Sequence, residues 1–215
     1  MELRMKIVLV LTAVLALSAL APSAAIAQYG LRGGTPMTFF VTSNGPGKGG
    51  DLGGLAGADA HCQMLATAAG QGNRTWRAYL STQGPNAVNA RDRIGKGPWH
   101  NAKGVEVGKN PDQIHGITHP FSMDRIITEE GSLIPNGNFE PNRHDILTGS
   151  TLDGKGYPAG MDMTCANWTS STTGKARVGH HDRAQWNSAH DSQGCTQVQL
   201  RASGGDGLFY CFAAQ

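Results

Sequence analysis

Four cysteines place the strongest constraint on how this chain can fold. They stand well apart along the sequence, at Cys62, Cys165, Cys195 and Cys211. No two of them have the C-x2–4-C spacing of a structural zinc site, so we do not expect zinc held by thiolates. An even number of cysteines in an exported protein indicates disulfide bonds, and four cysteines can pair in three ways. Cross-links suit this chain, because its 30 glycines lose much backbone entropy on folding.

The N-terminus has the pattern of an export signal. Arg4 and Lys6 precede an apolar run over residues 7–21, and small residues follow up to the Ala-Ile-Ala at 25–27. This is the order of a signal peptide, and the run is shorter than the roughly 20 residues that span a bilayer. We expect cleavage to remove residues 1–27. The remaining chain has no second long apolar run, so we predict a secreted or periplasmic protein without membrane insertion.

Charge and length narrow the class of protein. The formal net charge is +2 at pH 7 without a basic cluster, so the chain lacks the footprint of a nucleic-acid-binding protein. No basic amphipathic helix indicates binding to a membrane surface. A length of 215 residues suits one domain after removal of the signal. We therefore expect a flexible lead-in at residues 28–36 and a single, monomeric domain at 37–215.

Local patterns predict the first elements of this domain. Residues 37–42 are rich in β-forming side chains and predict a strand. A helix follows, because apolar residues recur at three- and four-residue steps and form one face. These residues are Leu55, Ala58, Cys62, Leu65, Ala66 and Ala69. Gly70 stands where such a helix ends.

The rest of the chain predicts short strands around a long irregular region. Residues 76–81 predict a second strand and residues 89–94 a short helix. Residues 95–144 show no clear periodicity, and we expect them to pack as an ordered excursion on the domain. Later strands are predicted at 145–149, 164–168, 176–178 and 208–212. This order predicts an α+β fold with a mostly antiparallel sheet, one or two helices and a long loop region.

Three phrases of the sequence follow one another in a known order. Residues 51–62 are DLGGLAGADAHC, residues 76–81 are WRAYLS and residues 165–170 are CANWTS. Together with the closing Cys195 and Cys211, they resemble the C-type-lectin-like family, in particular endostatin-like domains and bacterial secreted lectin-like proteins. The resemblance implies a C-type-lectin-like fold, endostatin-like in its connections.

The resemblance covers residues 37–212 and also implies a disulfide pairing. In that family four cysteines form nested bridges, the first with the fourth and the second with the third. Carried over, this gives Cys62–Cys211 and Cys165–Cys195. The outer bridge would join the predicted helix to the last strand and close nearly the whole domain. Closing so long a loop stabilises a fold by upwards of about 4 kcal/mol in the loop-entropy account.

A loop triplet provides a calcium hypothesis. The Glu-Pro-Asn at 140–142 resembles the triplet with which calcium-dependent C-type lectins bind calcium and sugar hydroxyls, and Ca²⁺ takes carboxylate and amide oxygens. The same lectins have a Trp-Asn-Asp phrase, whereas here the Trp-Asn at 186–187 is followed by serine. Glu140 and Asn142 are thus the calcium candidates, and a plain turn is the alternative.

A second group of candidates lies close together in the sequence. It consists of His180, His181, Asp182, Trp186, Asn187, His190 and Asp191. Imidazole and carboxylate groups suit transition metals. Neighbouring strand residues point to opposite faces, however, so His180 and His181 could not both ligate unless the backbone turns. We expect the group to crowd on one surface beside the Cys165–Cys195 bridge and to bind a ligand. The alternative is that these side chains only hydrogen-bond their own loop.

A third hypothesis is an exposed aromatic platform for sugar rings. Trp99, Trp168 and Trp186 lie near the glycine-rich half of the chain. Trp168 stands close to Cys165, and we expect it in the core. Trp186 is the tryptophan that we expect near a surface.

These features favour a binding protein over an enzyme. The chain has no G-x-S-x-G nucleophile phrase and no phosphate-binding glycine loop, and its cysteines are expected in disulfides. We predict an exported protein with no catalytic residues and no required cofactor. It would bind a carbohydrate or another extracellular macromolecule, such as a protein, through residues 95–145 and 179–194. One alternative is an envelope structural or protein-interaction module without a sugar site. The other is a metal-dependent hydrolase that uses His180, His181 and His190.

Overall fold

The central strand of the fold is β8, which spans Gly205–Ala213 and pairs with three other strands. The computed structural model describes residues 35–214, so the expected signal peptide at 1–27 and most of the lead-in lie outside the described residues. In chain order, the other elements are β1 Phe39–Val41, α1 Gly54–Ala68, β2 Trp76–Ala78, a 3₁₀ turn Ala90–Asp92, β3 Trp99–His100, β4 Glu106–Gly108, α2 Pro111–Ile114, β5 Asp145–Leu147, α3 Cys165–Trp168, β6 Arg177–His180, β7 His190–Asp191 and α4 Gln197–Ala202.

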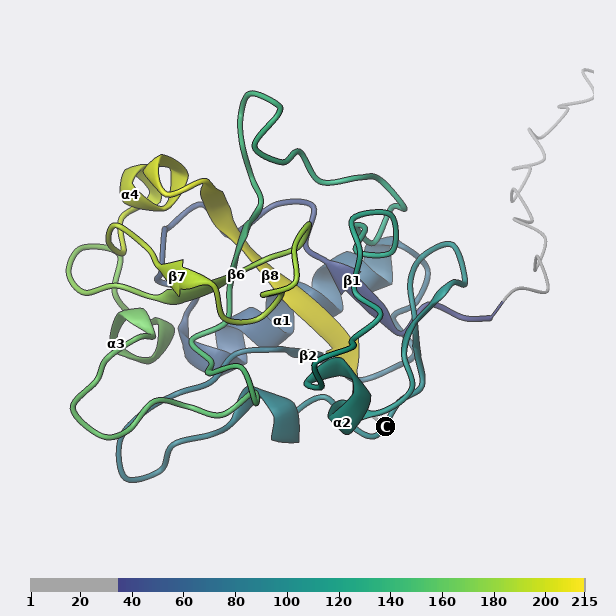
Figure 1. Ribbon diagram of the computed structural model, residues 1–215, viewed down its shortest axis with the longest axis horizontal. Coiled ribbons are helices and arrows are strands. Elements are labelled where there is room, and N and C mark those ends of the chain that lie inside the picture. Colours follow the sequence, from purple (N-terminus) through teal and green to yellow (C-terminus); the bar gives the residue numbers. More distant parts are fainter. Residues whose placement is uncertain (1–34, 215) are drawn as a thin grey trace, which may run out of the picture. The chain divides into compact units, whose positions relative to one another are not determined.

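One mixed sheet organises these elements. Its strand order is β1-β8-β5-β6-β7, and β2 pairs with the C-terminal part of β8. All of these pairs are antiparallel except β5 with β8. A separate two-stranded sheet joins β3 and β4. Figure 1 shows β8 as the yellow strand that crosses the middle of the view, with α1 behind it. The structure thus confirms an α+β fold with mostly antiparallel strands.

Both faces of β8 are buried. Successive strand residues point to opposite faces, and the stretch Leu208–Ala213 alternates between two clusters of buried side chains. Leu208, Tyr210 and Phe212 enter one cluster, and the residues between them enter the other, which α1 covers. A strand that is covered on both sides is typically a continuous apolar run, as residues 208–213 of β8 are.

α1 has the apolar face that the sequence predicts. Its buried residues are Ala58, Cys62, Leu65 and Ala66. The chain leaves the helix at Gly70, where φ is 77°, a value that glycine adopts without strain. The polar side of α1 is fixed to β2 through Asp59. Its carboxylate accepts hydrogen bonds from the backbone N of Ala78 at 2.9 Å and from Arg77 Nη1 at 2.7 Å.

Two disulfides join the elements in the nested pairing. Cys62 is bonded to Cys211 and Cys165 to Cys195, each with a Cα–Cα distance of 5.7 Å. The outer bridge ties α1 to β8 and spans 149 positions, whereas the inner bridge spans 30. The pairing implied by the family resemblance is therefore confirmed. Disulfides fit an oxidising compartment outside the cytosol.

The long segment 95–144 shares a core with β8 instead of building its own. It contains β3, β4 and α2, and it belongs to the same compact unit as the rest of the described residues. The buried apolar side chains that it adds to this core are Trp99, Val107, Ile114, Phe121, Ile126 and Ile134. They come from very short elements and from the irregular backbone between them, which explains why their spacing shows no periodicity.

The strand predicted at 164–168 is wrong. Cys165–Trp168 forms a turn in which all four residues have positive φ, between 48° and 67°. Left-handed backbone costs about 1–2 kcal/mol per residue, so other contacts must hold it. The side chains of Asp162 and Thr164 accept backbone hydrogen bonds from inside the turn at 2.8 and 3.0 Å. One end is fixed by the inner disulfide and the other by burial of the tryptophan. Tertiary contacts override the strand pattern here.

The sequence prediction omits α4, although its N-terminus carries a recognisable pattern. Thr196 Oγ1 accepts a hydrogen bond from the backbone N of Gln199 at 3.1 Å, and Gln199 Oε1 accepts one from the backbone N of Thr196 at 3.2 Å. This is a capping box. The buried residue of α4 is Leu200, and a single apolar position gives no periodic stripe.

The described helices also bear on membrane insertion. Between residues 35 and 214, none has the length and apolar character that crossing a membrane requires.

Removing each disulfide should have a different effect on stability. The Cys62→Ala/Cys211→Ala variant should lose about 5 kcal/mol of unfolding free energy, and the Cys165→Ala/Cys195→Ala variant about 3–4 kcal/mol, because the outer bridge closes the longer loop. Urea denaturation of both variants measures this difference. A larger loss from the inner bridge would contradict the loop-closure explanation.

Candidate functional site

Three neighbouring strands bring polar side chains to one face of the sheet. Asp145 of β5 is paired directly with His180 of β6, and His190 of β7 is paired with Val178. Directly paired residues share a face, and so do residues two apart on a strand. The register therefore places Asp145, His180 and His190 on the same face, and His144 immediately precedes β5.

Three imidazole nitrogens surround one carboxylate oxygen. Oδ1 of Asp145 lies 3.2 Å from Nε2 of both His144 and His180. Nε2 of His190 lies 3.4 Å from the same oxygen. The rings of His144 and His180 are stacked, with centroids 4.4 Å apart. One ligand atom from each of His144, Asp145 and His180 lies within 4.8 Å of the others, which is close enough for the three to share one metal ion. We call His144, Asp145, His180 and His190 the histidine cluster.

Most polar side-chain atoms of His144, Asp145 and His180 are buried and have no hydrogen-bond partner among the described residues. The Asp145 side chain is 2% exposed, and neither of its oxygens has a hydrogen-bond partner in residues 35–214. Both ring nitrogens of His180 and Nδ1 of His144 also have none there. The contacts to Asp145 are short but lack hydrogen-bond geometry. A buried polar group left unpaired costs about 1–3 kcal/mol, and a charged group costs more.

A second carboxylate stands behind the cluster. Oδ1 of Asp182 lies 3.4 Å from Nδ1 of His144, whereas Asp145 contacts Nε2 of the same ring. Carboxylates in this position orient metal-binding imidazoles and raise their basicity. Asp182 is therefore placed to support a ligand rather than to be one.

Burial favours the neutral form of His144 and of His181. It lowers the pKa of His144, and the charge of Asp145 only partly opposes this effect. Burial also lowers the pKa of the adjacent His181, to about 4. Neutral imidazole has the free nitrogen lone pair that binds a metal. His190 has 42% of its side chain exposed, so the cluster meets solvent on the side of β7.

The predicted ligand-binding group does not form one surface. His180 and His190 belong to the histidine cluster, and Asp182 contacts it from behind. His181 is fully buried. Asp191 forms ion pairs with two neighbouring basic side chains. The prediction of a single crowded surface is wrong. His190 and Asp191 point to opposite faces of β7, and the connection between β6 and β7 turns His181 into the interior.

Trp186 and Asn187 are structural residues. Trp186 is 1% exposed, stacks on Phe121 with centroids 4.3 Å apart, and donates a hydrogen bond from Nε1 to the Ile114 carbonyl at 2.7 Å. Asn187 is buried and donates to Tyr79 Oη at 3.0 Å and to two backbone carbonyls. Each residue has only 1% of its surface exposed.

The predicted aromatic platform is wrong as well. All four tryptophans are 1% exposed or less: Trp76, Trp99, Trp168 and Trp186. The prediction that Trp168 lies in the core is confirmed, and the prediction that Trp186 lies near a surface is not. Large aromatic side chains contribute most when they are buried, and their indole N–H groups find partners inside.

Two members of the histidine cluster, His144 and Asp145, were not among the predicted site residues. Residues 145–149 were predicted only as a strand. The sequence feature that could have indicated these two residues is an adjacent His-Asp pair at the start of a predicted strand. This pair forms part of a site only because its strand pairs with the strand that ends in His180. Pairing between segments so distant in sequence is not visible in local patterns.

A groove of about 560 Å³ lies beside the histidine cluster. Residues 140–143 and 201–206 line it. The calcium candidates Glu140 and Asn142 are both on this groove. Asn142 Oδ1 accepts a hydrogen bond from the backbone N of His144 at 3.2 Å, which is the local turn contact expected of an asparagine in a plain turn.

Alanine substitutions at Trp186 and His190 should differ in their effect on stability, because Trp186 lies in the core and His190 lies at the edge of the candidate site. Trp186→Ala should lower the free energy of unfolding by about 3–5 kcal/mol, because it leaves a cavity among aromatic neighbours. His190→Ala should change it by less than about 1 kcal/mol, because that side chain is half exposed. Urea denaturation measures both values. If Trp186→Ala were as stable as the natural protein, its assignment to the core would be wrong.

Comparison with known proteins finds no family model that matches the chain and no curated protein with significant similarity to it.

Proposed function

We propose that this chain is an exported, disulfide-stabilised binding protein that holds a divalent transition-metal ion between His144, Asp145 and His180. The observation that carries the proposal is the Asp145 carboxylate, which is buried, unpaired and surrounded by imidazole nitrogens. One bound cation would engage one carboxylate oxygen and one nitrogen of each imidazole together. Protonated histidines are a poorer explanation, because burial lowers the pKa of His144.

The distances from the carboxylate oxygen to the two imidazole nitrogens support this proposal. In a tetrahedral zinc site with bonds of about 2.0–2.1 Å, neighbouring ligand atoms are about 3.3 Å apart. Nε2 of His144 and of His180 each lie 3.2 Å from Oδ1 of Asp145. Asp182 contributes the outer carboxylate that such histidines usually contact.

The donor set favours a particular class of metal. Two imidazoles and a carboxylate suit Zn²⁺ and neighbouring transition metals, whereas Ca²⁺ and Mg²⁺ prefer oxygen alone. The proposal departs from the sequence expectation of no required cofactor. Calcium at Glu140 and Asn142 stays a separate prediction at a different place.

We also propose the finer fold, a C-type-lectin-like domain of the endostatin-like kind. The nested disulfides, and the pairing of the first strand with the last, support it. The ligand proposed for such a domain is a carbohydrate or another extracellular macromolecule. It would bind on the side of the molecule that carries the metal and the groove.

A second candidate function is metal-dependent hydrolysis. Three protein ligands leave a coordination position for water, as in catalytic zinc sites. The half-exposed His190, 3.4 Å from Asp145 Oδ1, is the observation that favours this candidate, because it could exchange protons beside such a water. Its residues differ from the predicted trio, since His181 is buried away from solvent. Zinc-dependent turnover of a chromogenic ester would favour it.

Zinc binding tests the primary proposal. The purified, metal-free chain should bind one Zn²⁺, and Asp145→Asn and His180→Ala should each weaken binding by at least about 100-fold. Asp182→Asn should weaken it by about 10–100-fold, because it removes only the outer carboxylate. Isothermal titration with zinc chloride measures all four proteins.

His61→Gln is the matched control, because His61 lies on α1 and contacts the Asn44 carbonyl outside the cluster. It should bind zinc as the natural chain does. Near-UV circular dichroism checks that each variant is folded. Undetectable zinc binding by the natural chain, or unchanged binding by folded Asp145→Asn, would refute the site.

A further inference from the structure

We propose that the groove beside the histidine cluster binds an oxyanion, that is a carboxylate, phosphate or sulfate group, which completes the coordination of the metal. This inference rests on the proposed metal site and names the chemical class of its ligand. Three observations carry it: an opening at Gly204, two arginines on the groove, and the charge of the metal site.

Gly204 leaves space between the groove and the nitrogen that faces the metal. It lines the groove, and a Cβ at this position would lie 3.2 Å from Nε2 of His144 and 2.9 Å from Nδ2 of Asn142. This Nε2 is the atom that lies 3.2 Å from Asp145 Oδ1. The backbone φ of Gly204 is 103°, which favours glycine. A metal held by this nitrogen is therefore within reach of a group lying in the groove.

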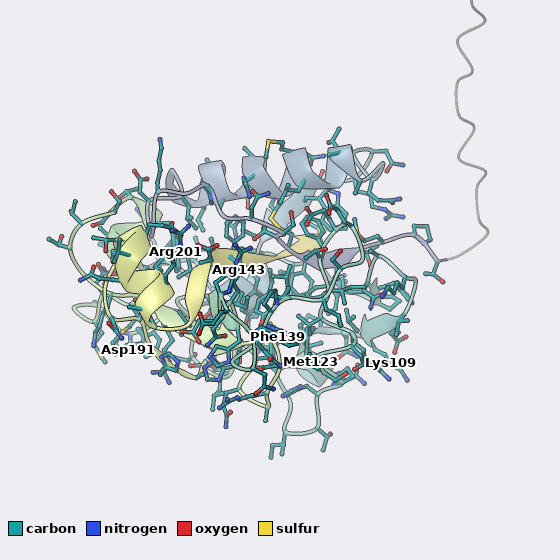
Figure 2. The ribbon with its side chains drawn as sticks, turned by 90° about the horizontal axis from the view of Figure 1, so that it is seen from above. Lys109, Met123, Phe139, Arg143, Asp191 and Arg201 are labelled. Carbon is teal, nitrogen blue, oxygen red and sulfur yellow. A yellow bond between two sulfur atoms is a disulfide. The ribbon has the colours of Figure 1, made fainter. Side chains whose placement is uncertain are left out.

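Two guanidinium groups line the same groove. Figure 2 shows Arg201 on α4 and Arg143 on the segment that precedes β5. Nε of Arg143 lies 3.2 Å from Asp206 Oδ2, and Nε of Arg201 lies 2.7 Å from Asp206 Oδ1. Within residues 35–214 both contact Asp206 through Nε, which leaves their terminal nitrogens to donate to a ligand. Guanidinium groups match oxyanions in geometry and charge.

The charges of the site favour an anion over a neutral ligand. A divalent metal bound directly by one carboxylate and two neutral imidazoles keeps a net positive charge among its ligands, because the second carboxylate, Asp182, lies on the other side of the His144 ring.

The negative charge of Asp206 is shared among several donors, because Gln197 Nε2 also donates to its Oδ1 at 2.7 Å. Asp206 accepts a hydrogen bond from Arg201 and lies against Arg143. Glu140 also lines the groove, so the two arginines face two carboxylates and the metal supplies the excess positive charge.

Cobalt substitution provides a direct test. The Co²⁺-loaded chain should have a visible absorption spectrum that acetate, inorganic phosphate or sulfate changes saturably, because an anion that joins the metal alters its ligand field. Separate titrations with the three anions distinguish the three sources of the oxyanion. The anion that gives the lowest dissociation constant identifies the preferred group.

The arginines provide the variants. Arg143→Gln and Arg201→Gln should each weaken anion binding by at least about 10-fold, while Co²⁺ affinity changes by less than threefold. Gly204→Ala should weaken anion binding similarly if it folds, which circular dichroism checks. Arg91→Gln is the matched control, because Arg91 pairs with Asp112 away from this groove. It should bind anions as the natural chain does.

The outcomes separate this inference from the metal proposal. Absence of Co²⁺ binding would refute the metal site and the oxyanion site with it. Bound Co²⁺ whose spectrum ignores all three anions would refute the oxyanion site alone. Anion binding that is equally strong in Arg143→Gln, Arg201→Gln and the natural chain would also refute it, because the anion would then be held by the metal without the groove.

Discussion

The structure depends on the burial of β8 on both faces. Its side chains enter two cores, and a strand of this kind is stable only when both faces are covered. α1 covers one face and is bonded to it through Cys211. The irregular segment 95–144 contributes to the core on the other face. β1, β2 and β5 satisfy the backbone of β8, and β6 and β7 extend the sheet from β5. The position of each strand of the site therefore follows from β8.

The same sheet buries ionisable side chains at positions where apolar side chains would make the fold more stable. Asp145, His180 and His190 share one face because of the strand register, and the carboxylate is buried without a hydrogen bond. Truncating one partner of a buried charge usually destabilises a protein, whereas apolar replacements of the whole group often do not. Departures from the most stable choice are expected at functional sites. A bound metal ion would resolve the conflict and couple binding to folding.

Local patterns predicted the elements whose burial is visible in the local sequence. The helix around Cys62 was identified because its three- and four-residue periodicity marks one buried face, and the strand at 208–212 because it is a continuous run of apolar residues. The left-handed turn at Cys165–Trp168 was predicted as a strand, because the contacts that hold it come from elsewhere in the chain. The prediction of the site was limited in the same way, because contacts between distant segments are not visible in local sequence. His180 and His190 were candidates because they stand close in sequence, whereas Asp145 gains its role only from pairing across two strands. Trp186 was misplaced because its polar neighbours suggested a surface.

The most direct test of the metal site is the X-ray absorption spectrum of the purified, zinc-loaded chain at the zinc edge. The account predicts nitrogen and oxygen ligands at about 2.0–2.1 Å, outer scattering from at least two imidazole rings, and no sulfur. A shell of water oxygens without imidazole scattering would mean that zinc is only loosely associated. That result would contradict the assignment of His144, Asp145 and His180 as a metal site.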